Sequence, residues 1–278
     1  MAKKRRKKKK QPNNALVITI TALAAVLFTL VTVLLLQSCL AQTEPEVPVT
    51  EPPAPTEPTA APNERDPEDF YMETGVLHYP GAELGIDVST HQGLIDWGQV
   101  ADAGVSFAII RAGYRGSTKG NLYEDELFWD NLNGAKEAGL KVGVYFFSQA
   151  LTVEEAVEEA EYVLDILDGE PLELPVYFDW EQIAGLSRVS DPGKLPLTEC
   201  SEAFCETVRQ QGYTPGVYFN QDYGYAYLDF VRLQNYELWL AEYGDNPTFR
   251  YRYDCLQYTD AGNIPGIETT VDMDLIFK

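Results

Sequence analysis

The sequence predicts an α/β fold in which eight strands form a barrel. From Glu83 onward, short apolar runs alternate with helical patterns. The runs are continuous rather than alternating, which is typical of parallel strands covered on both faces. Between residues 236 and 277 three further strands follow too closely for helical crossovers, so we expect them to be meander-like or antiparallel. Five strand–helix units and three closing strands make a barrel with an incomplete coat of helices.

The individual elements follow from the same patterns. Strands are expected at 83–89, 106–113, 141–149, 174–181, 215–220, 236–243, 253–260 and 269–277. Helices are expected at about 97–103, 125–138, 153–167 and 197–212. The third helix has acidic residues in its first turn, which suits the helix dipole. The fourth begins at a Thr that can cap it and ends in Gly.

The first forty residues do not belong to this barrel. Lys3 to Lys10 are all cationic, and Ala15–Leu36 contains no charge. As a helix that run spans roughly 33 Å, enough to cross a bilayer. We therefore expect a cytoplasmic basic tail at 1–14 and a single transmembrane helix at 15–40, with the rest outside the cell. The alternative is a cleaved lipoprotein signal, because "LQSC" at Leu36–Cys39 is similar to a bacterial lipobox.

Residues 41–70 are rich in Pro, Thr and Glu and are expected to form an extended spacer before a catalytic domain at 71–278. The chain carries a formal charge of −22 although Lys3–Lys10 alone contributes eight positive charges. The exported part is therefore strongly acidic, which argues against nucleic acid as a partner.

Several classes of site are missing from the sequence. Only His78 and His91 are present, there is no G-x-S-x-G elbow, and no Gly-rich loop is present for a nucleotide phosphate. No C-x-x-C pair exists, so we expect no metal and no cofactor. Beyond Cys39, the remaining cysteines, Cys200, Cys205 and Cys255, are odd in number, which indicates at least one free thiol and leaves their pairing open.

Carboxylates at the expected strand ends carry the chemistry. Asp179 and Glu181 lie two positions apart after a buried strand and so point the same way. Asp87 ends the first strand, Asp272 lies in the last, and chemistry in such barrels gathers at the C-terminal ends of strands. Crowding keeps one acid protonated near neutral pH. Acids beside aromatic side chains suit a carbohydrate site; the aromatic candidates are Tyr145, Phe147, Tyr218 and Trp239.

The motifs together resemble the glycoside hydrolase family 25 lysozymes. They are "GIDVSTHQGLIDWGQV", "FAIIRAGYRG", "DELFWDNLNGAKEAGLKVGVYFFSQA", "PVYFDWE", "PGVYFN", "LWLAEY", "LQYTDAG" and "VDMD". The resemblance runs from about Glu83 to Phe277. It implies a TIM-like (β/α)5(β)3 barrel and cleavage of the β-1,4 bond between N-acetylmuramic acid and N-acetylglucosamine in peptidoglycan.

The resemblance also assigns roles. It implies that Glu181 is the general acid and base, with Asp179 its partner and Asp87 and Asp272 the other catalytic carboxylates. Gln257 of "LQYTDAG" and the four aromatic residues are expected to bind substrate, and His91 to fix the first loop. Participation of the substrate's 2-acetamido group, steadied by Asp179, is favoured, while inversion and retention stay open.

Two alternatives remain at this stage. A wall-binding protein that holds glycan without cutting it would use the same side chains. A chitinase-like glycosidase is the second, but its longer D-x-x-D-x-D-x-E signature is absent. The expected partners are peptidoglycan strands and, through the first helix, the membrane, with the chain a monomer.

Overall fold

The computed structural model describes residues 59–183, 185, 188 and 191–277. The predicted basic tail, the predicted transmembrane helix and the first part of the spacer lie outside the described residues. Among the residues that are described, no helix is long and apolar enough to span a membrane.

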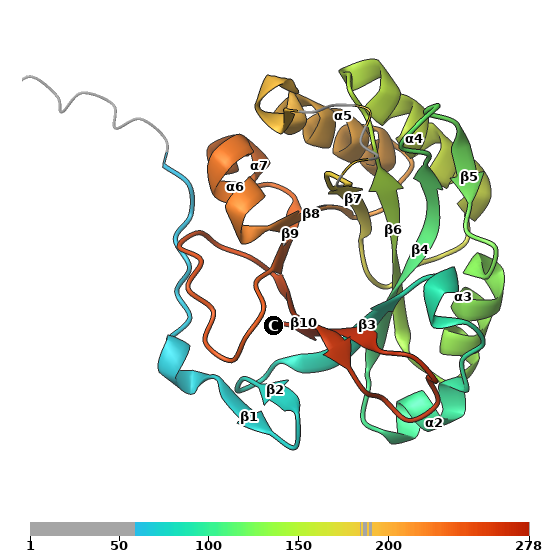
Figure 1. The fold of residues 1–278 in the computed structure, drawn as a ribbon, viewed down its shortest axis with the longest axis vertical. Coiled ribbons are helices and arrows are strands. Elements are labelled where there is room, and N and C mark those ends of the chain that lie inside the picture. The colour runs from blue at the N-terminus through green and yellow to red at the C-terminus, as the bar shows by residue number, and fades with distance from the viewer. Residues whose placement is uncertain (1–58, 184, 186–187, 189–190, 278) are drawn as a thin grey trace, which may run out of the picture. The chain divides into compact units, whose positions relative to one another are not determined.

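Eight strands close into the predicted barrel (Figure 1). Around the barrel they follow in the order β3 (Glu83–Val88), β4 (Phe107–Arg115), β6 (Lys141–Ser148), β7 (Val176–Trp180), β8 (Pro215–Asn220), β9 (Glu237–Ala241), β10 (Cys255–Gly262) and β11 (Val271–Ile276). The pairing of β11 with β3 and of β3 with β4 completes the closure. The TIM-like α/β fold is thereby confirmed.

The direction of the closing strands corrects one expectation. β11 is antiparallel to both of its neighbours, as expected. β9, however, is parallel to β8 and to β10. The prediction of antiparallel or meander-like closing strands was therefore wrong for β9 and for its pairing with β10. Two short helices between Gln221 and Leu233 return the chain from β8 to β9, and the loop at 242–254 is long enough to return it from β9 to β10 without a helix.

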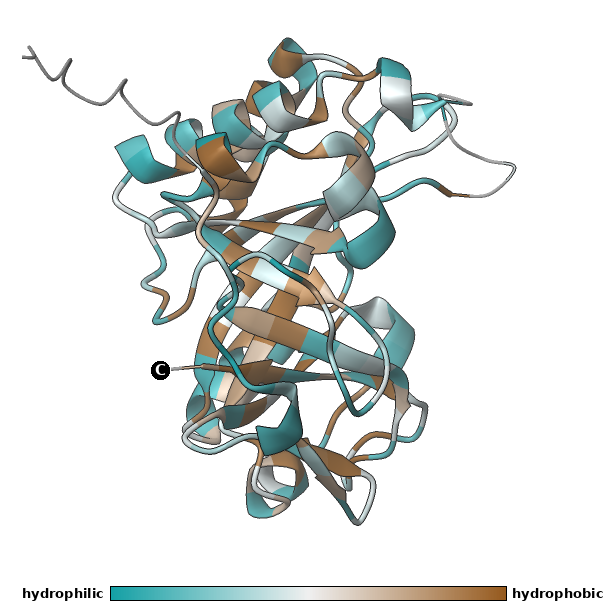
Figure 2. Ribbon diagram, turned by 90° about the vertical axis from the view of Figure 1, so that its left-hand side faces the viewer, coloured by the Kyte–Doolittle hydropathy of each residue, from teal (hydrophilic) through white to brown (hydrophobic). Residues whose placement is uncertain are grey.

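Helices cover the outside of the barrel unevenly (Figure 1). They are α2 (Trp97–Asp102), α3 (Phe128–Glu137), α4 (Val153–Leu167), α5 (Leu197–Gln210), α6 (Gln221–Tyr227) and α7 (Phe230–Leu233). Thr152 caps α4 by accepting from the Glu155 N–H, whereas α5 begins at Leu197 without a side-chain cap. Figure 2 shows apolar strands at the centre and polar residues on the outer helices.

Several short elements were not predicted. They are the hairpin β1 (Tyr71–Glu73) and β2 (Val76–His78), the edge strand β5 (Leu122–Glu124), helices α6 and α7, and the 3-10 turns η1 (Pro67–Asp69), η2 (Thr90–Gln92) and η3 (Pro192–Lys194). β5 pairs with β4 outside the closed barrel. β5 thereby extends the sheet beside the C-terminal end of β4.

Alternate side chains of each strand serve two separate cores. Outward-facing residues such as Phe178 on β7 pack on the helices, with Phe178 contacting Phe204 of α5 at 5.2 Å between ring centroids. Inward-facing rings fill the barrel, among them Phe107 and Tyr177. Glycines make room for these rings: a Cβ at Gly85 would lie 2.2 Å from the Phe107 ring, and one at Gly216 2.3 Å from Tyr177. The interior is thus a packed floor beneath the C-terminal mouth.

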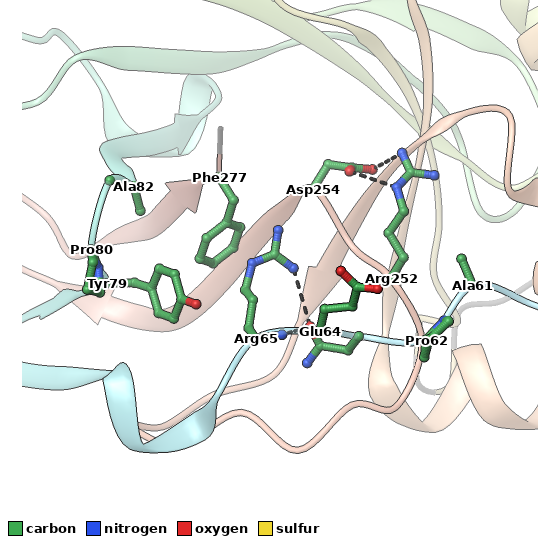
Figure 3. A pocket seen from close by; sticks show the side chains of 12 residues that line it. Ala61, Pro62, Glu64, Arg65, Tyr79, Pro80, Ala82, Arg252, Asp254 and Phe277 are labelled. Carbon is green, nitrogen blue, oxygen red and sulfur yellow. Dashed lines mark hydrogen bonds and ion pairs between the residues drawn. The ribbon is translucent and has the colours of Figure 1, made fainter.

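The described end of the expected spacer packs on the barrel. Residues 60–66, the N-terminal strap, run beside residues 249–252, and the Asn63 N–H donates to the Arg250 carbonyl over 2.8 Å. The Arg65 guanidinium lies 3.7 Å from the Phe277 ring centroid (Figure 3). A cavity of about 620 Å³ lies here, at the N-terminal ends of the parallel strands and away from the predicted carboxylates.

Candidate active site

The predicted catalytic carboxylates meet at the C-terminal mouth of the barrel. A cavity of about 380 Å³ opens there, lined by Asp87 of β3, Asp179 and Glu181 at the end of β7, and Asp272 of β11. Three strands therefore bring together side chains that lie up to 185 positions apart in the sequence. A second cavity, of about 410 Å³, adjoins it and shares Glu181, Tyr218 and Tyr243 with the first.

Gln257 organises one wall of this mouth. Its side-chain nitrogen donates to Asp87 Oδ2 over 2.7 Å. Its oxygen accepts from the hydroxyls of Tyr218 and Tyr243, each over 3.1 Å. The amide therefore fixes the orientation of a carboxylate and of two rings on neighbouring strands.

Asp179 and Glu181 share a crowded, poorly solvated environment. Burial and then the Glu181 charge raise the pKa of Asp179 well above its usual range, while Arg111 opposes this. Burial also raises the pKa of Glu181, and a hydrogen bond from Tyr218 lowers it. Two such close groups titrate as a unit. Arg111 favours the charge on Asp179 and so limits the rise of its pKa.

Tyr218 has one hydroxyl hydrogen for two acceptors. It reaches Gln257 over 3.1 Å, and it also hydrogen-bonds Glu181. As negative charge develops on Glu181, that hydrogen is drawn toward the carboxylate, while Tyr243 continues to donate to Gln257. Tyr218 thereby stabilises Glu181 in its ionised form.

Between β3 and β10, β11 contributes two aspartates to the same wall as Gln257. Burial raises the pKa of Asp272 to about 6, a hydrogen bond with Asp87 opposes the shift, and the charges of Asp260 and Glu181 add to it. Asp274 lies deeper and is fully buried, and the Trp239 indole donates to it over 2.9 Å. Burial raises the pKa of Asp274 well above its usual range.

The predicted aromatic residues divide between the cavity and the floor. Tyr145, Phe147 and Tyr218 line the mouth. Trp239 also reaches it, but the residue is only 1% exposed and its ring packs at 4.8 Å from that of Tyr218. Trp239 therefore acts mainly as part of the floor that positions Asp274. The half-exposed Tyr243 offers the larger free ring.

Sequence reasoning missed Arg111, Tyr243 and Asp260 in the lining of the mouth, and Asp274 beneath it. Asp274 was detectable as the i+2 neighbour of Asp272 on one strand face. Arg111 was detectable as a lone cation in an apolar strand. It pairs with Asp125, whose Oδ2 accepts from the Arg111 Nε over 2.8 Å and from the Thr90 N–H over 3.1 Å. His91 lines the cavity beside the Ser89–Gln92 capping box.

In the described part of the chain no group of three or more His, Cys, Asp or Glu residues is placed to hold a metal ion. Cys200, Cys205 and Cys255 are buried and free, so the expectation of at least one free thiol is confirmed. The site's chemistry thus rests on carboxyl groups, one guanidinium and hydroxyls.

Comparison with known proteins agrees with this geometry. Residues 86–267 match the family described as glycosyl hydrolases family 25. The chain belongs to this family. It is also similar to the autolytic lysozyme of Clostridium acetobutylicum, with 30% identity over 193 residues that cover 68% of this chain and 54% of the relative. The chain therefore spans about half of that relative's length.

Solved structures share the fold. The modular autolysin LytC from Streptococcus pneumoniae, solved in complex with a synthetic peptidoglycan ligand, superposes with a TM-score of 0.62 at 23% identity, covering 75% of this chain and 52% of LytC. A family 25 glycosyl hydrolase from Bacillus anthracis gives a TM-score of 0.59 at 22% identity, covering 70% and 89% of the two chains. The matched family segment contains the barrel strands β4 to β10 and the second half of β3, whereas β11 follows it in the sequence.

Proposed function

We propose that this protein is an N-acetylmuramidase that hydrolyses the β-1,4 bond between N-acetylmuramic acid and N-acetylglucosamine in peptidoglycan. The observation that carries the proposal is the gathering of Asp87, Asp179, Glu181 and Asp272 at one cavity in a family 25 barrel. The similarity to an autolytic lysozyme supports a cell-wall glycan as substrate.

Glu181 acts as the general acid. Its raised pKa keeps it protonated in the empty site, and it gives that proton to the leaving glycosidic oxygen. Tyr218 then stabilises the carboxylate that results. In the second half of the reaction the same carboxylate takes a proton from water.

Asp179 steadies the substrate's 2-acetamido group as that group attacks the anomeric carbon. Its Oδ1 is buried and has no hydrogen-bond partner among the residues that the structure describes. Such an acceptor is costly until a donor arrives, and the acetamido N–H is a donor of the right kind. Arg111 favours the ionised form of Asp179 that this role needs.

The N-terminal segment supports a proposal about where the enzyme is located. The basic block, the uncharged run 15–36 and the Pro-rich spacer are those of an enzyme tethered to the outer face of a membrane, where it meets the wall. Fractionation of cells, with and without globomycin to block lipoprotein processing, tests whether the tether is a retained helix or a lipid on Cys39.

The activity is tested on purified peptidoglycan with the full chain in detergent and its Glu181→Gln variant. Products are reduced with borohydride and their new ends are identified by mass spectrometry. Muramitol ends from the parent alone support the proposal. Glucosaminitol ends mean that the other glycosidic bond is cut, and sedimentation with the wall without new ends means that the protein only binds glycan.

A further inference from the structure

A stacked pair of tyrosines lies beside the catalytic mouth and is not used by the proposed mechanism. Tyr114 of β4 and Tyr123 of β5 have ring centroids 5.2 Å apart and an interplanar angle of 24°. Tyr123 is 43% exposed. The pair therefore presents an apolar ring face to solvent, and a flat apolar face is what a ligand ring can stack on.

The strand register places this pair on the same side as the catalytic cavity. Phe147 lines the cavity and pairs with Tyr114 across β6 and β4, and Tyr114 pairs with Tyr123 across β4 and β5. Directly paired residues share a face of the sheet. The neighbouring Arg115 points the opposite way, since it is buried against Glu159 of α4. The three rings therefore form one row leading outward from the mouth.

A bulge in β4 makes this arrangement possible. The pairing between β4 and β6 slips by one residue between Arg111 and Gly113. Without that extra residue, Tyr114 would face the helices rather than the mouth. The Arg111 guanidinium, which lines the cavity, lies 5.3 Å from the Tyr114 ring centroid, so the row is continuous with the catalytic wall.

We propose that Tyr123, supported by Tyr114, is a stacking platform for a sugar ring of the same glycan strand, beyond the rings held in the catalytic cavity. This inference rests on the proposed function, because the platform serves a polymer that continues out of the cavity. The Arg111 guanidinium lies over the Tyr114 ring, and Tyr123 stacks on Tyr114. These two contacts hold the Tyr123 ring in place. Tyr123 then offers its ring face to the apolar face of a pyranose, the contact typical of carbohydrate sites.

The test compares a long and a short substrate. Peptide-free glycan strands and the tetrasaccharide of two disaccharide repeats are given to the parent and to Tyr123→Ala, Tyr123→Trp and Tyr71→Ala. Tyr71 is the matched control: it is exposed and stacks on His78 at the same 5.2 Å, but it belongs to the separate β1–β2 sheet and not to the row that starts at Phe147.

Tyr123→Ala is expected to lower kcat/KM about 3- to 10-fold on long strands, mainly through KM, and to leave the tetrasaccharide rate unchanged. Tyr123→Trp retains the rate on long strands, and Tyr71→Ala changes neither rate. Equal rates of parent and Tyr123→Ala on long strands overturn the platform. So does an equal loss on both substrates that Tyr123→Trp does not restore.

The experiments distinguish an error in the proposed platform from an error in the proposed function. If the parent cuts neither substrate, the proposed function fails. Affinity electrophoresis in gels that contain the long strands then decides the platform: weaker retardation of Tyr123→Ala than of Tyr71→Ala supports it, and equal retardation overturns it.

Discussion

Gln257 donates to Asp87 over 2.7 Å and joins the first strand of the barrel to its seventh. The same amide accepts from Tyr218 and Tyr243. One neutral side chain thus holds a carboxylate and two rings of the cavity in register.

Replacing Gln257 by Leu removes the donor to Asp87 and the acceptor for both tyrosines. Because a buried polar group left without its partner costs about 1–3 kcal/mol, kcat/KM on peptidoglycan is expected to fall about 10- to 100-fold. Gln99→Leu is the control, since Gln99 makes a 2.8 Å bond to Asp96 on an exposed helix far from the cavity. A similar loss in both variants would contradict the role of Gln257.

Tyr218→Phe removes the hydroxyl that hydrogen-bonds Glu181. That bond lowers the pKa of Glu181, so its loss raises this pKa and keeps the general acid protonated to higher pH. The alkaline limb of the kcat/KM profile on wall glycan is expected to move to higher pH. Tyr213→Phe, which removes a hydroxyl bonded to the Glu170 carbonyl, should leave the limb in place. A shift to lower pH would show that Tyr218 does not stabilise the ionised form.

The crowded acids also make the folded state less stable as pH rises. The pKa of Asp272 is about 6 in the folded chain against 3.8 for the isolated side chain, so between these values the folded state binds more protons. Stability is therefore lost as pH rises through this window. From pH 5 to 7.5 this single group lowers the free energy of unfolding by about 1.4 kcal/mol, and Asp272→Asn abolishes that part. Urea unfolding at both pH values measures this change in the free energy of unfolding. The same change with pH in the parent and in Asp272→Asn would contradict the prediction.

A buried ion pair outside the site sets up a matched stability test. Arg115 donates to Glu159 over 2.6 Å and to Glu158 over 2.7 Å, but Glu159 is buried while the Glu158 side chain is 59% exposed. Glu159→Ala leaves the buried Nε of Arg115 and the Ser148 hydroxyl without their acceptor, at a cost of about 3 kcal/mol. Glu158→Ala costs less than about 1 kcal/mol. Denaturant unfolding compares the two, and equal losses would mean that burial does not decide the strength of the pair.

The sequence predicted the barrel because its strands are apolar on both faces, a pattern that depends on local residues alone. It predicted Asp179 and Glu181 as a pair for the same reason, since strand geometry relates residues two apart. It could not place Asp274 beside Asp87, or Tyr123 in one row with Tyr114 and Phe147, because these contacts depend on strand order and on the bulge in β4. The direction of β9 was missed because the short helices α6 and α7 before it were not predicted.

Two packing contacts were equally hidden from local sequence patterns. Gly85 and Gly216 gave no strand signal of their own, yet their missing side chains admit the rings of Phe107 and Tyr177. The strap at 60–66 is polar and Pro-rich, and only its pairing with residues 249–252 distinguishes it from a free spacer.

The most direct test of the central claim concerns the proton of Glu181. A dinitrophenyl leaving group departs without protonation, whereas a sugar hydroxyl needs an acid. Glu181→Gln is therefore expected to lose about 10²- to 10⁴-fold in kcat/KM on peptidoglycan. With a dinitrophenyl glycoside of the wall disaccharide, the variant is expected to release the dinitrophenyl group at most of the parent rate. An equal loss on both substrates would contradict the assignment of Glu181 as the general acid.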